Sequence, residues 1–326
     1  MDLSMIQSRW DKIASPRENN KSISVVRFPP LCLPDLFLGI EEEGKRCLLL
    51  RVGSSIEIPE NSHENLSLEY LYDAPFGYIT ICLDNEFFAD LFNDLIVSIY
   101  NQVWEKKQTP ELSDEFIQIF NRWSDFFDNS KSQRLSPDAL QGLMGELTYL
   151  GHLLGDAKQS TVNEILESWV GPFHARTDFI LPEKHVEVKT ISNSSKQVTI
   201  SSEYQLEGES GLGMELVVMY FEIEPSNGVS LREKVDELKE LVHQIHGDYS
   251  LILRGLKQLG VLPTNIGDHD NTRFKYLTNS IYDAAADGFP KLVRSAISSD
   301  IKSVRYTLKL HNLSEFLITE DIIGND

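Results

Sequence analysis

The chain has 326 residues, a formal net charge of −20 and an isoelectric point near 4.8. This length leaves room for a full hydrophobic core and favours two domains. The negative charge argues against a protein that coats nucleic acid non-specifically, because phosphate binding depends on clustered lysine and arginine. Any contact with nucleic acid must therefore be local, metal-assisted or aided by a partner.

The three cysteines, Cys32, Cys47 and Cys82, form neither a CxxC pair nor a Cys/His cluster. We therefore expect no structural zinc site and no disulfide framework, as in a protein of the reducing cytoplasm. The first residues lack the basic start and apolar run of a signal peptide, and no apolar stretch approaches the roughly 18 residues of a membrane helix. We expect a soluble, cytoplasmic protein with no membrane partner.

The first predicted elements are strands. Residues 1–83 consist of short apolar runs broken by Pro, Gly, Asn and Ser, and strands are expected at 24–28, 47–52 and 77–83. From 84 to 105 the apolar residues recur at helical spacing, and a second helix is expected over 112–127. Both helices are interpreted as packing elements, since aromatic stripes at helical spacing usually belong to a core.

A third helix carries the first candidate site residue. Ser136 is its expected N-cap and Pro137 its first helical residue. At about 100° per residue, Glu146 lies at the edge of the leucine-rich stripe. Burying an ionised carboxylate is costly unless it is paired or binds a metal. Glu146 is therefore a candidate cation ligand, and the alternative is a boundary glutamate whose carboxylate reaches water.

Residues 178–189 predict a hairpin, because an apolar run is followed by Pro182 and Glu183 and then by alternating residues. With two or four residues in the loop, Asp178 lies directly opposite Glu187. Directly opposed residues have Cβ atoms about 4.5–5.5 Å apart, and like charges there destabilise a sheet. The pair therefore indicates that something offsets the repulsion.

A divalent cation bound by Asp178 and Glu187 would offset it. Mg²⁺ takes oxygen ligands, often one or two carboxylates with waters, and fits this pair better than Zn²⁺, with Mn²⁺ as an alternative. Lys189 shares the face of Glu187, because side chains two apart on a strand point the same way. The alternative interpretation is a solvated hairpin face without a metal.

Beyond the hairpin, strands are expected at 198–202 and 214–223, followed by two helices with Ser230 and Asp248 as caps, the second ending at Gly260. Further strands are expected at 274–282 and 304–310. This order predicts an α/β (α+β) fold with a short mixed sheet flanked by helices. We divide the chain into an N-terminal β-rich region (1–83), a core with preceding helices (84–262) and a C-terminal β-containing extension (263–326).

Several of these segments carry a family resemblance. They are Gly145 and Glu146 in the leucine-rich helix, residues 169–172 and 177–179, and Glu187-Val188-Lys189. In these segments the chain resembles the PD-(D/E)XK nuclease superfamily, and more closely a bacterial group of domains of unknown function found near restriction and phage-defence genes. The closer resemblance extends to residues 201–206, 289–290 and Tyr306. Thr177 stands where the motif has proline, a change that many members share.

The resemblance implies a restriction-endonuclease-like core and a role for each site residue. Asp178 and Glu187 would be metal ligands, Lys189 would stand at the attacking water, and Glu146 would be the helix-borne acid that binds metal through water or holds a second ion. The main-chain carbonyl of Val188 is a further candidate ligand, because it lies between the two key side chains.

Three polar residues are weaker candidates for substrate binding. His174 and Arg176 share a face with Asp178 if the strand starts early, and could then contact phosphate; ordinary loop residues are the alternative. Gln205 follows a strand and matches a glutamine that several nuclease groups keep near the metal. The alternative for Gln205 is a surface glutamine.

Two classes of function remain. The first is a Mg²⁺-dependent endonuclease that cleaves DNA in bacterial restriction or phage defence, and the set of Glu146, Asp178, Glu187 and Lys189 favours it. The second is a nuclease-fold subunit that binds partner proteins or nucleic acid and has little activity of its own. The acidity of the chain favours a partner protein such as a helicase, ATPase or methyltransferase. The motif leaves an RNA substrate and a homo-oligomer open.

Overall fold

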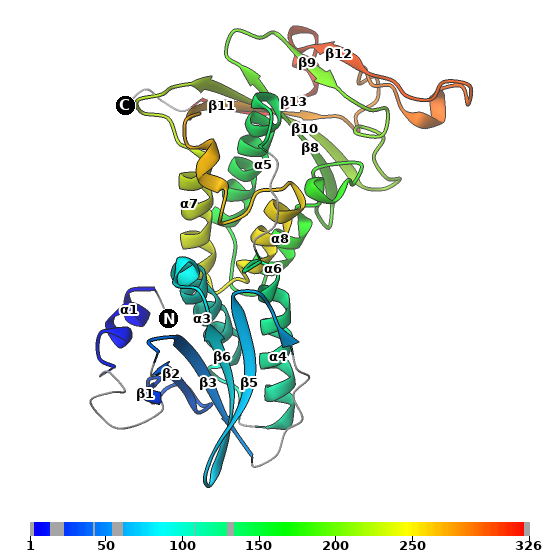
Figure 1. Ribbon diagram of the computed structural model, residues 1–326. Coiled ribbons are helices and arrows are strands. Elements are labelled where there is room, and N and C mark those ends of the chain that lie inside the picture. Colours follow the sequence, from blue (N-terminus) through cyan, green and yellow to red (C-terminus); the bar gives the residue numbers. More distant parts are fainter. Residues whose placement is uncertain are drawn as a thin grey trace. The chain divides into compact units, whose positions relative to one another are not determined.

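A computed structural model of the chain describes residues 3–13, 23–41, 43–53, 61–107, 109–128 and 134–322 (Figure 1). The chain forms two compact units, one of Met1–Lys131 with His246–Ser250 and one of Ser132–Ile245 with Leu251–Asp326. Among the residues described, every helix is too short or too polar to cross a membrane. We consider each unit separately.

The first unit contains an antiparallel six-stranded sheet in the order β1-β2-β3-β6-β5-β4. The three expected strands are confirmed, and β2, β4 and β5 are additional. The elements are α1 Leu3–Trp10, β1 Ile23–Arg27, β2 Leu36–Glu41, β3 Arg46–Val52, β4 Asn61–Ser62, β5 Leu66–Asp73, β6 Phe76–Leu83, α3 Ala89–Val103 and α4 Pro110–Ser124.

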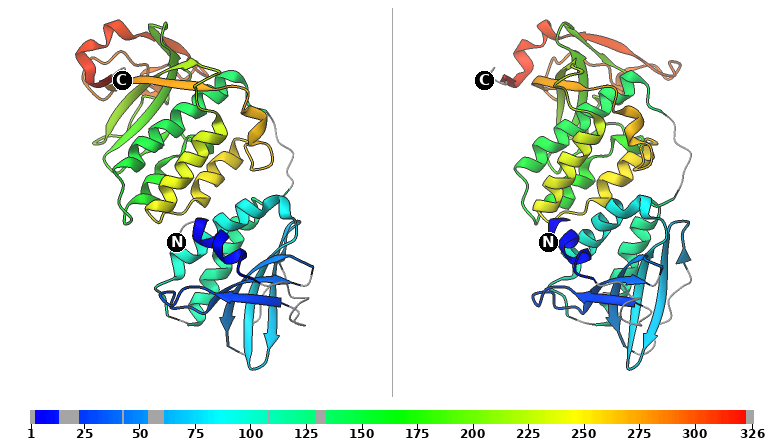
Figure 2. Two further views of the ribbon diagram at one scale, coloured as in Figure 1. Left: turned by 90° about the vertical axis from the view of Figure 1, so that its left-hand side faces the viewer. Right: turned by 60° about the vertical axis from the view of Figure 1, so that its left-hand side comes forward.

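Helices α3 and α4 pack within this first unit, although the sequence grouped them with the nuclease core. The Phe28 ring beside β1 stacks on Tyr100 of α3 with centroids 5.6 Å apart. Asn65 Nδ2 donates a hydrogen bond of 2.7 Å to the carbonyl oxygen of Phe127, beyond the end of α4. Figure 2 shows both helices beside the sheet of the N-terminal unit, and their buried apolar residues help to form its core.

Two of the cysteines are paired. Cys47 on β3 lies directly opposite Cys82 on β6, and the two form a disulfide. Our expectation of no disulfide is wrong for this pair, because 35 residues of sequence separate two positions that sheet pairing makes neighbours. Cys32 is buried and free.

The second unit is built on a mixed five-stranded sheet in the order β13-β11-β10-β8-β7. Strands β8 and β10 are parallel, and the other neighbours are antiparallel. Figure 1 shows helices α5 and α7 side by side in this unit. The elements are α5 Pro137–Gly155, α6 Val162–Ser168, β7 Phe179–Ile180, β8 Lys184–Ser192, β10 Gly213–Ile223, α7 Leu231–Gln244, α8 Ser250–Gln258, β11 Phe274–Asp283 and β13 Leu317–Ile322. The predicted fold class, a short mixed sheet with flanking helices, is confirmed.

Strands β9 Gln197–Ile200 and β12 Tyr306–Lys309 pair only with each other, in a separate two-stranded sheet of the described residues. The apolar side chains of this small sheet join one core with those of β10, among them Val198, Leu308 and Leu216. The strand expected at 198–202 therefore exists, but it is not part of the hairpin's sheet. Strands β11 and β13 lie in the region that the sequence assigned to a C-terminal extension, and they form part of the main sheet.

Helix α5 begins as predicted and lies unusually close to β8. Ser136 Oγ accepts a hydrogen bond of 3.2 Å from Ala139 N, and Pro137 occupies the first turn. A Cβ atom on Gly145 would overlap the side-chain methyl group of Thr190 on β8. Glycine at this position therefore permits the close approach that brings the next residue, Glu146, to the edge of the sheet.

We predict that Gly145→Ala lowers the free energy of unfolding by about 1–3 kcal/mol, the usual cost of overpacking a core. Gly142 on the same helix is the matched control, because its added Cβ would meet nothing within 4 Å. Gly142→Ala should instead stabilise the chain by up to about 1 kcal/mol, since alanine is the better helix former. Urea unfolding followed by circular dichroism measures both, and equal effects would contradict the close packing.

Candidate active site

The predicted hairpin is confirmed, including its register. Phe179 on β7 pairs with Val186 on β8, and a hydrogen bond of 2.9 Å from Leu181 N to Lys184 O closes a loop of two residues. Asp178 N donates to Val186 O at 3.1 Å, although Val186 already pairs with Phe179, so Asp178 and Phe179 both lie against Val186. The ladder is therefore irregular at this point, and the direct opposition of Asp178 and Glu187 stays a prediction.

Glu187 is the most deeply buried acid of the site. Its side chain is 1% exposed, and Lys189 Nζ lies 2.5 Å from its Oε1 atom. The second oxygen, Oε2, is buried and has no hydrogen-bond partner within the described part of the chain. A buried carboxylate oxygen without a partner is costly. This atom therefore has the environment expected of a metal ligand.

Two further carboxylates converge beside it. Asp178 Oδ2 accepts a hydrogen bond of 2.8 Å from Val188 N, and Glu146 Oε2 accepts one of 2.7 Å from Trp169 Nε1. A Cβ atom on Gly171 would lie 2.9 Å from Glu146 Oε2 and 3.0 Å from Asp178 Oδ1. The carboxylates of Glu146 and Asp178 thus both border the space beside Gly171. Because glycine has no side chain, this space stays open.

Trp169 is a positioning residue for which the sequence predicts no role. Besides its hydrogen bond to Glu146, it forms an isolated antiparallel bridge with Phe179. A Cβ atom on Gly255 of α8 would lie 2.5 Å from the Trp169 ring, so glycine is needed for α8 to pack against the indole. In the sequence, Trp169 is marked only by its place in the segment 169–172, which carries the family resemblance. That segment does not show which group accepts the hydrogen bond of the indole N–H.

The electrostatics of the site follow from burial. Burial, with the charge of Asp178 adding to it, raises the pKa of Glu146 to about 8. Burial also raises the pKa of Asp178, and it raises that of Glu187 well above its usual value. Burial alone would lower the pKa of Lys189, but the charges of Glu187 and Asp178 outweigh it and the pKa is raised. If all three acids were ionised, they would leave a negative excess of two charges beside the Lys189 ammonium group, which a divalent cation would neutralise; without a cation, the raised pKa values favour protonated acids.

The donor set fits a hard divalent cation. Glu146, Asp178 and Lys189 are each partly exposed, so solvent and ligands reach the site, whereas Glu187 is buried. The candidate ligands are carboxylate oxygens, which suit Mg²⁺ or Mn²⁺ better than Zn²⁺. Val188 lies between the key side chains and already binds Asp178 through its N–H. Its carbonyl stays a predicted ligand.

The weaker candidates lie elsewhere. Gly171–Phe173 form a 3-10 helix and His174 has a φ of 59°, so the strand does not start early. The expectation that His174 and Arg176 share a face with Asp178 is therefore wrong. Both are exposed, and the Arg176 guanidinium lies 5.3 Å from the centre of the Tyr204 ring. Gln205 Oε1 accepts a hydrogen bond of 2.8 Å from Ser201 N. Substrate binding by these three residues stays a prediction.

The comparison with protein families agrees with this geometry. A family model described as "Putative PD-(D/E)XK family member (DUF4420)" matches residues 6–311. The chain belongs to this family. Searches of curated proteins and of solved structures gave no match. The matched residues span both units, so the N-terminal unit is part of what the family model describes.

We predict that Glu146→Gln stabilises the metal-free protein at neutral pH. The folded pKa of Glu146 is raised from 4.5 to about 8, so the folded state favours the protonated acid. The protonated Glu146 side chain contributes fully to the folding stability below pH 4.5. This contribution is lost as the pH rises towards 8. In EDTA at pH 7 the variant should gain roughly 1–3 kcal/mol, and its advantage should vanish near pH 4.5.

Thermal unfolding between pH 4.5 and 8 tests this, with Glu167→Gln on the exposed side of α6 as the control that leaves the pH profile unchanged. A profile for Glu146→Gln that is parallel to the wild type would contradict the assigned electrostatics.

Proposed function

We propose that the chain is a Mg²⁺-dependent endonuclease that cleaves DNA phosphodiester bonds in bacterial restriction or phage defence, with Mn²⁺ as a substitute ion. The observation that carries the proposal is the buried Oε2 atom of Glu187, which has no partner among the described residues and lies beside Lys189. The acids Glu146 and Asp178 border the same site. Apolar side chains at these positions would stabilise the fold better than buried acids do, so stability alone does not explain the acids.

Asp178, Glu187 and Glu146 would hold the cation, with the Val188 carbonyl as a further ligand. When bound, the cation would make a water molecule more acidic and offset the negative charge that develops on the phosphate. The carboxylates themselves hold that cation in place. Trp169 fixes the Glu146 carboxylate through its N–H, and Val188 N–H fixes that of Asp178.

Lys189 would orient the attacking water and stabilise negative charge. A lysine acts as a general base only when its pKa is lowered towards neutrality. Here the carboxylates of Glu187 and Asp178 raise its pKa, which keeps the ammonium group charged. The electrostatics of this site therefore favour a positioning and charge-stabilising role over proton abstraction.

The alternative function is a subunit that binds partners and has little activity of its own. The family match includes the N-terminal unit, and the candidate site is built from residues of the second unit alone. A separate unit in a chain of net charge −20 suits docking to a protein that brings the DNA, such as a helicase, ATPase or methyltransferase. Under this alternative the carboxylate site would be vestigial.

Cleavage assays distinguish the two. We predict that the full chain nicks supercoiled plasmid in Mg²⁺ or Mn²⁺ and does nothing in EDTA. Glu187→Gln and Lys189→Met should each lower the rate about a hundredfold or more, because each removes a group that acts on the transition state. A matched control is Asp156→Asn with Lys158→Ala, an exposed acid and lysine with the same spacing at the end of α5.

Cleavage that both site variants retain would overturn the proposed site. Cleavage of RNA but not of DNA in the same assay would overturn the substrate class. If the purified chain and its mixtures with candidate helicase, ATPase or methyltransferase partners leave plasmid and RNA intact, the binding-subunit alternative holds.

A further inference from the structure

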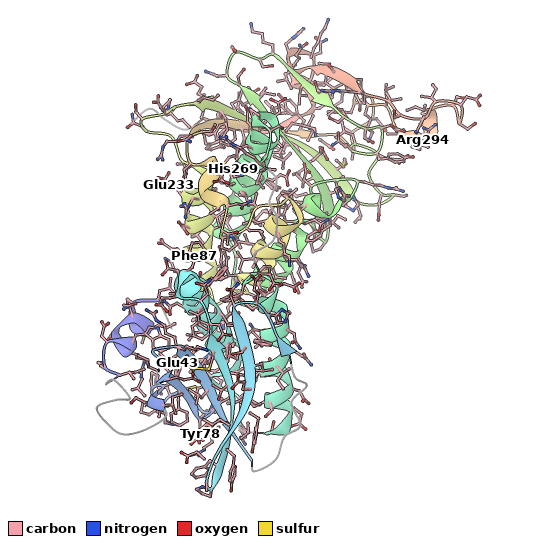
Figure 3. The ribbon with its side chains drawn as sticks, viewed as in Figure 1. Glu43, Tyr78, Phe87, Glu233, His269 and Arg294 are labelled. Carbon is pink, nitrogen blue, oxygen red and sulfur yellow. A yellow bond between two sulfur atoms is a disulfide. The ribbon has the colours of Figure 1, made fainter. Side chains whose placement is uncertain are left out.

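A basic arm, residues 291–305, lies beside the candidate site. Residues 291–309, the arm with strand β12, hold five lysines and arginines and a single acid, Asp300, in a chain whose net charge is −20. The structure describes every residue of the arm, and its regular structure is confined to the 3-10 turn Arg294–Ala296. Figure 3 labels Arg294 on this segment. The position of the arm depends on specific anchors.

Arg294 supplies the main anchor. It donates a hydrogen bond of 3.0 Å to Glu203 Oε1, and further ones to the carbonyl oxygens of Ile297 at 2.9 Å, Ser298 at 2.6 Å and Ile301 at 2.9 Å. Glu203 Oε2 accepts a hydrogen bond of 2.9 Å from Val304 N, at the other end of the arm. The side chain of Glu203 is 1% exposed, and hydrogen bonds from backbone N–H groups hold its pKa below the usual value. One buried carboxylate thus fixes both ends of the arm.

The arm also adjoins the active site. Leu292 N donates a hydrogen bond of 3.2 Å to the hydroxyl oxygen of Tyr306. Tyr306 packs against the core cluster that contains Leu216, and Leu216 on β10 pairs with Glu187 on β8, so Tyr306 lies on the face of the sheet that carries Glu187. Ser295 N donates to Glu207 Oε1 at 3.1 Å, and Glu207 lies 4.0 Å from Arg176. The arm and Tyr306 therefore lie on the same face of the sheet as Glu187.

Two cations of the arm stay available to an anion. Arg294 is used in the anchor, and Lys291 Nζ donates to Ala284 O at 2.6 Å. Lys302 and Arg305 are exposed, and neither forms an ion pair with any acid that the structure describes. Lys309 on β12 is exposed as well and extends the positive surface.

We propose that the arm is a preorganised phosphate-binding element that holds the backbone of duplex DNA at the site through Lys302 and Arg305. This inference rests on the proposed function and names the surface that meets its substrate. The anion that fits is phosphate, because the arm borders a site for phosphodiester chemistry. An anchored arm binds without first having to order its backbone, which lowers the entropic cost of binding.

The test is binding of a fluorescein-labelled duplex of about 30 base pairs by the full-length chain in EDTA, followed by anisotropy over a range of NaCl concentrations. Lys302→Ala with Arg305→Ala should raise Kd about tenfold or more at ~100 mM NaCl and reduce the slope of log K against log [NaCl] by about two, because each removed cation neutralises one phosphate. Lys302→Arg with Arg305→Lys should bind like the wild type.

The control is Lys158→Ala with Lys275→Ala, which removes two positive charges from exposed positions of the same unit. Equal weakening by both double variants would overturn the proposal, because net charge alone would then explain it. An unchanged Kd for the arm variant, no duplex binding by the wild type, or arm-dependent binding of single-stranded RNA in preference to duplex would also overturn it. Arm-dependent DNA binding without cleavage would refute the proposed function and leave this inference standing.

Discussion

The second unit is arranged around one costly feature, the Glu187 carboxylate, which is buried near two other acids. The hairpin brings Asp178 near enough for its charge to raise the pKa of Glu187, and Gly145 lets α5 approach β8 so that the charge of Glu146 acts there as well. The pKa of each of these three acids is raised. A sequence selected for stability alone would replace such acids with apolar residues. The cation proposed for this site would explain their presence.

The supporting contacts have a common purpose, because each fixes one group at that site. Trp169 holds Glu146, the Val188 N–H holds Asp178, and Gly171 keeps the space between them open. Further out, Glu203 anchors the basic arm through Arg294 and Val304. Under the proposed roles, the acidic surface would repel DNA and the basic arm would provide a local place for it to bind.

The parts that the sequence predicted are those governed by local rules. The two-residue loop at Pro182 and Glu183 fixed the hairpin register, and the cap at Ser136 fixed the start of α5. What the sequence could not predict depends on contacts between distant residues, such as the pairing of β9 with β12, the Cys47–Cys82 disulfide and the Trp169 hydrogen bond. His174 and Arg176 were misplaced because a 3-10 turn at Gly171–Phe173 stands where an extended strand was assumed.

The most direct test of the central claim is to locate Mn²⁺ by anomalous diffraction from crystals grown with the ion. The account predicts an ion bound by oxygens of Asp178 and Glu187, with Glu146 beside it, and its loss from crystals of Glu187→Gln. A different group, His63, Asp125 and Asp128, has ligand atoms within 4.8 Å of one another. Mn²⁺ bound only at that group, or no ion beside Glu187 at millimolar Mn²⁺, would contradict the account.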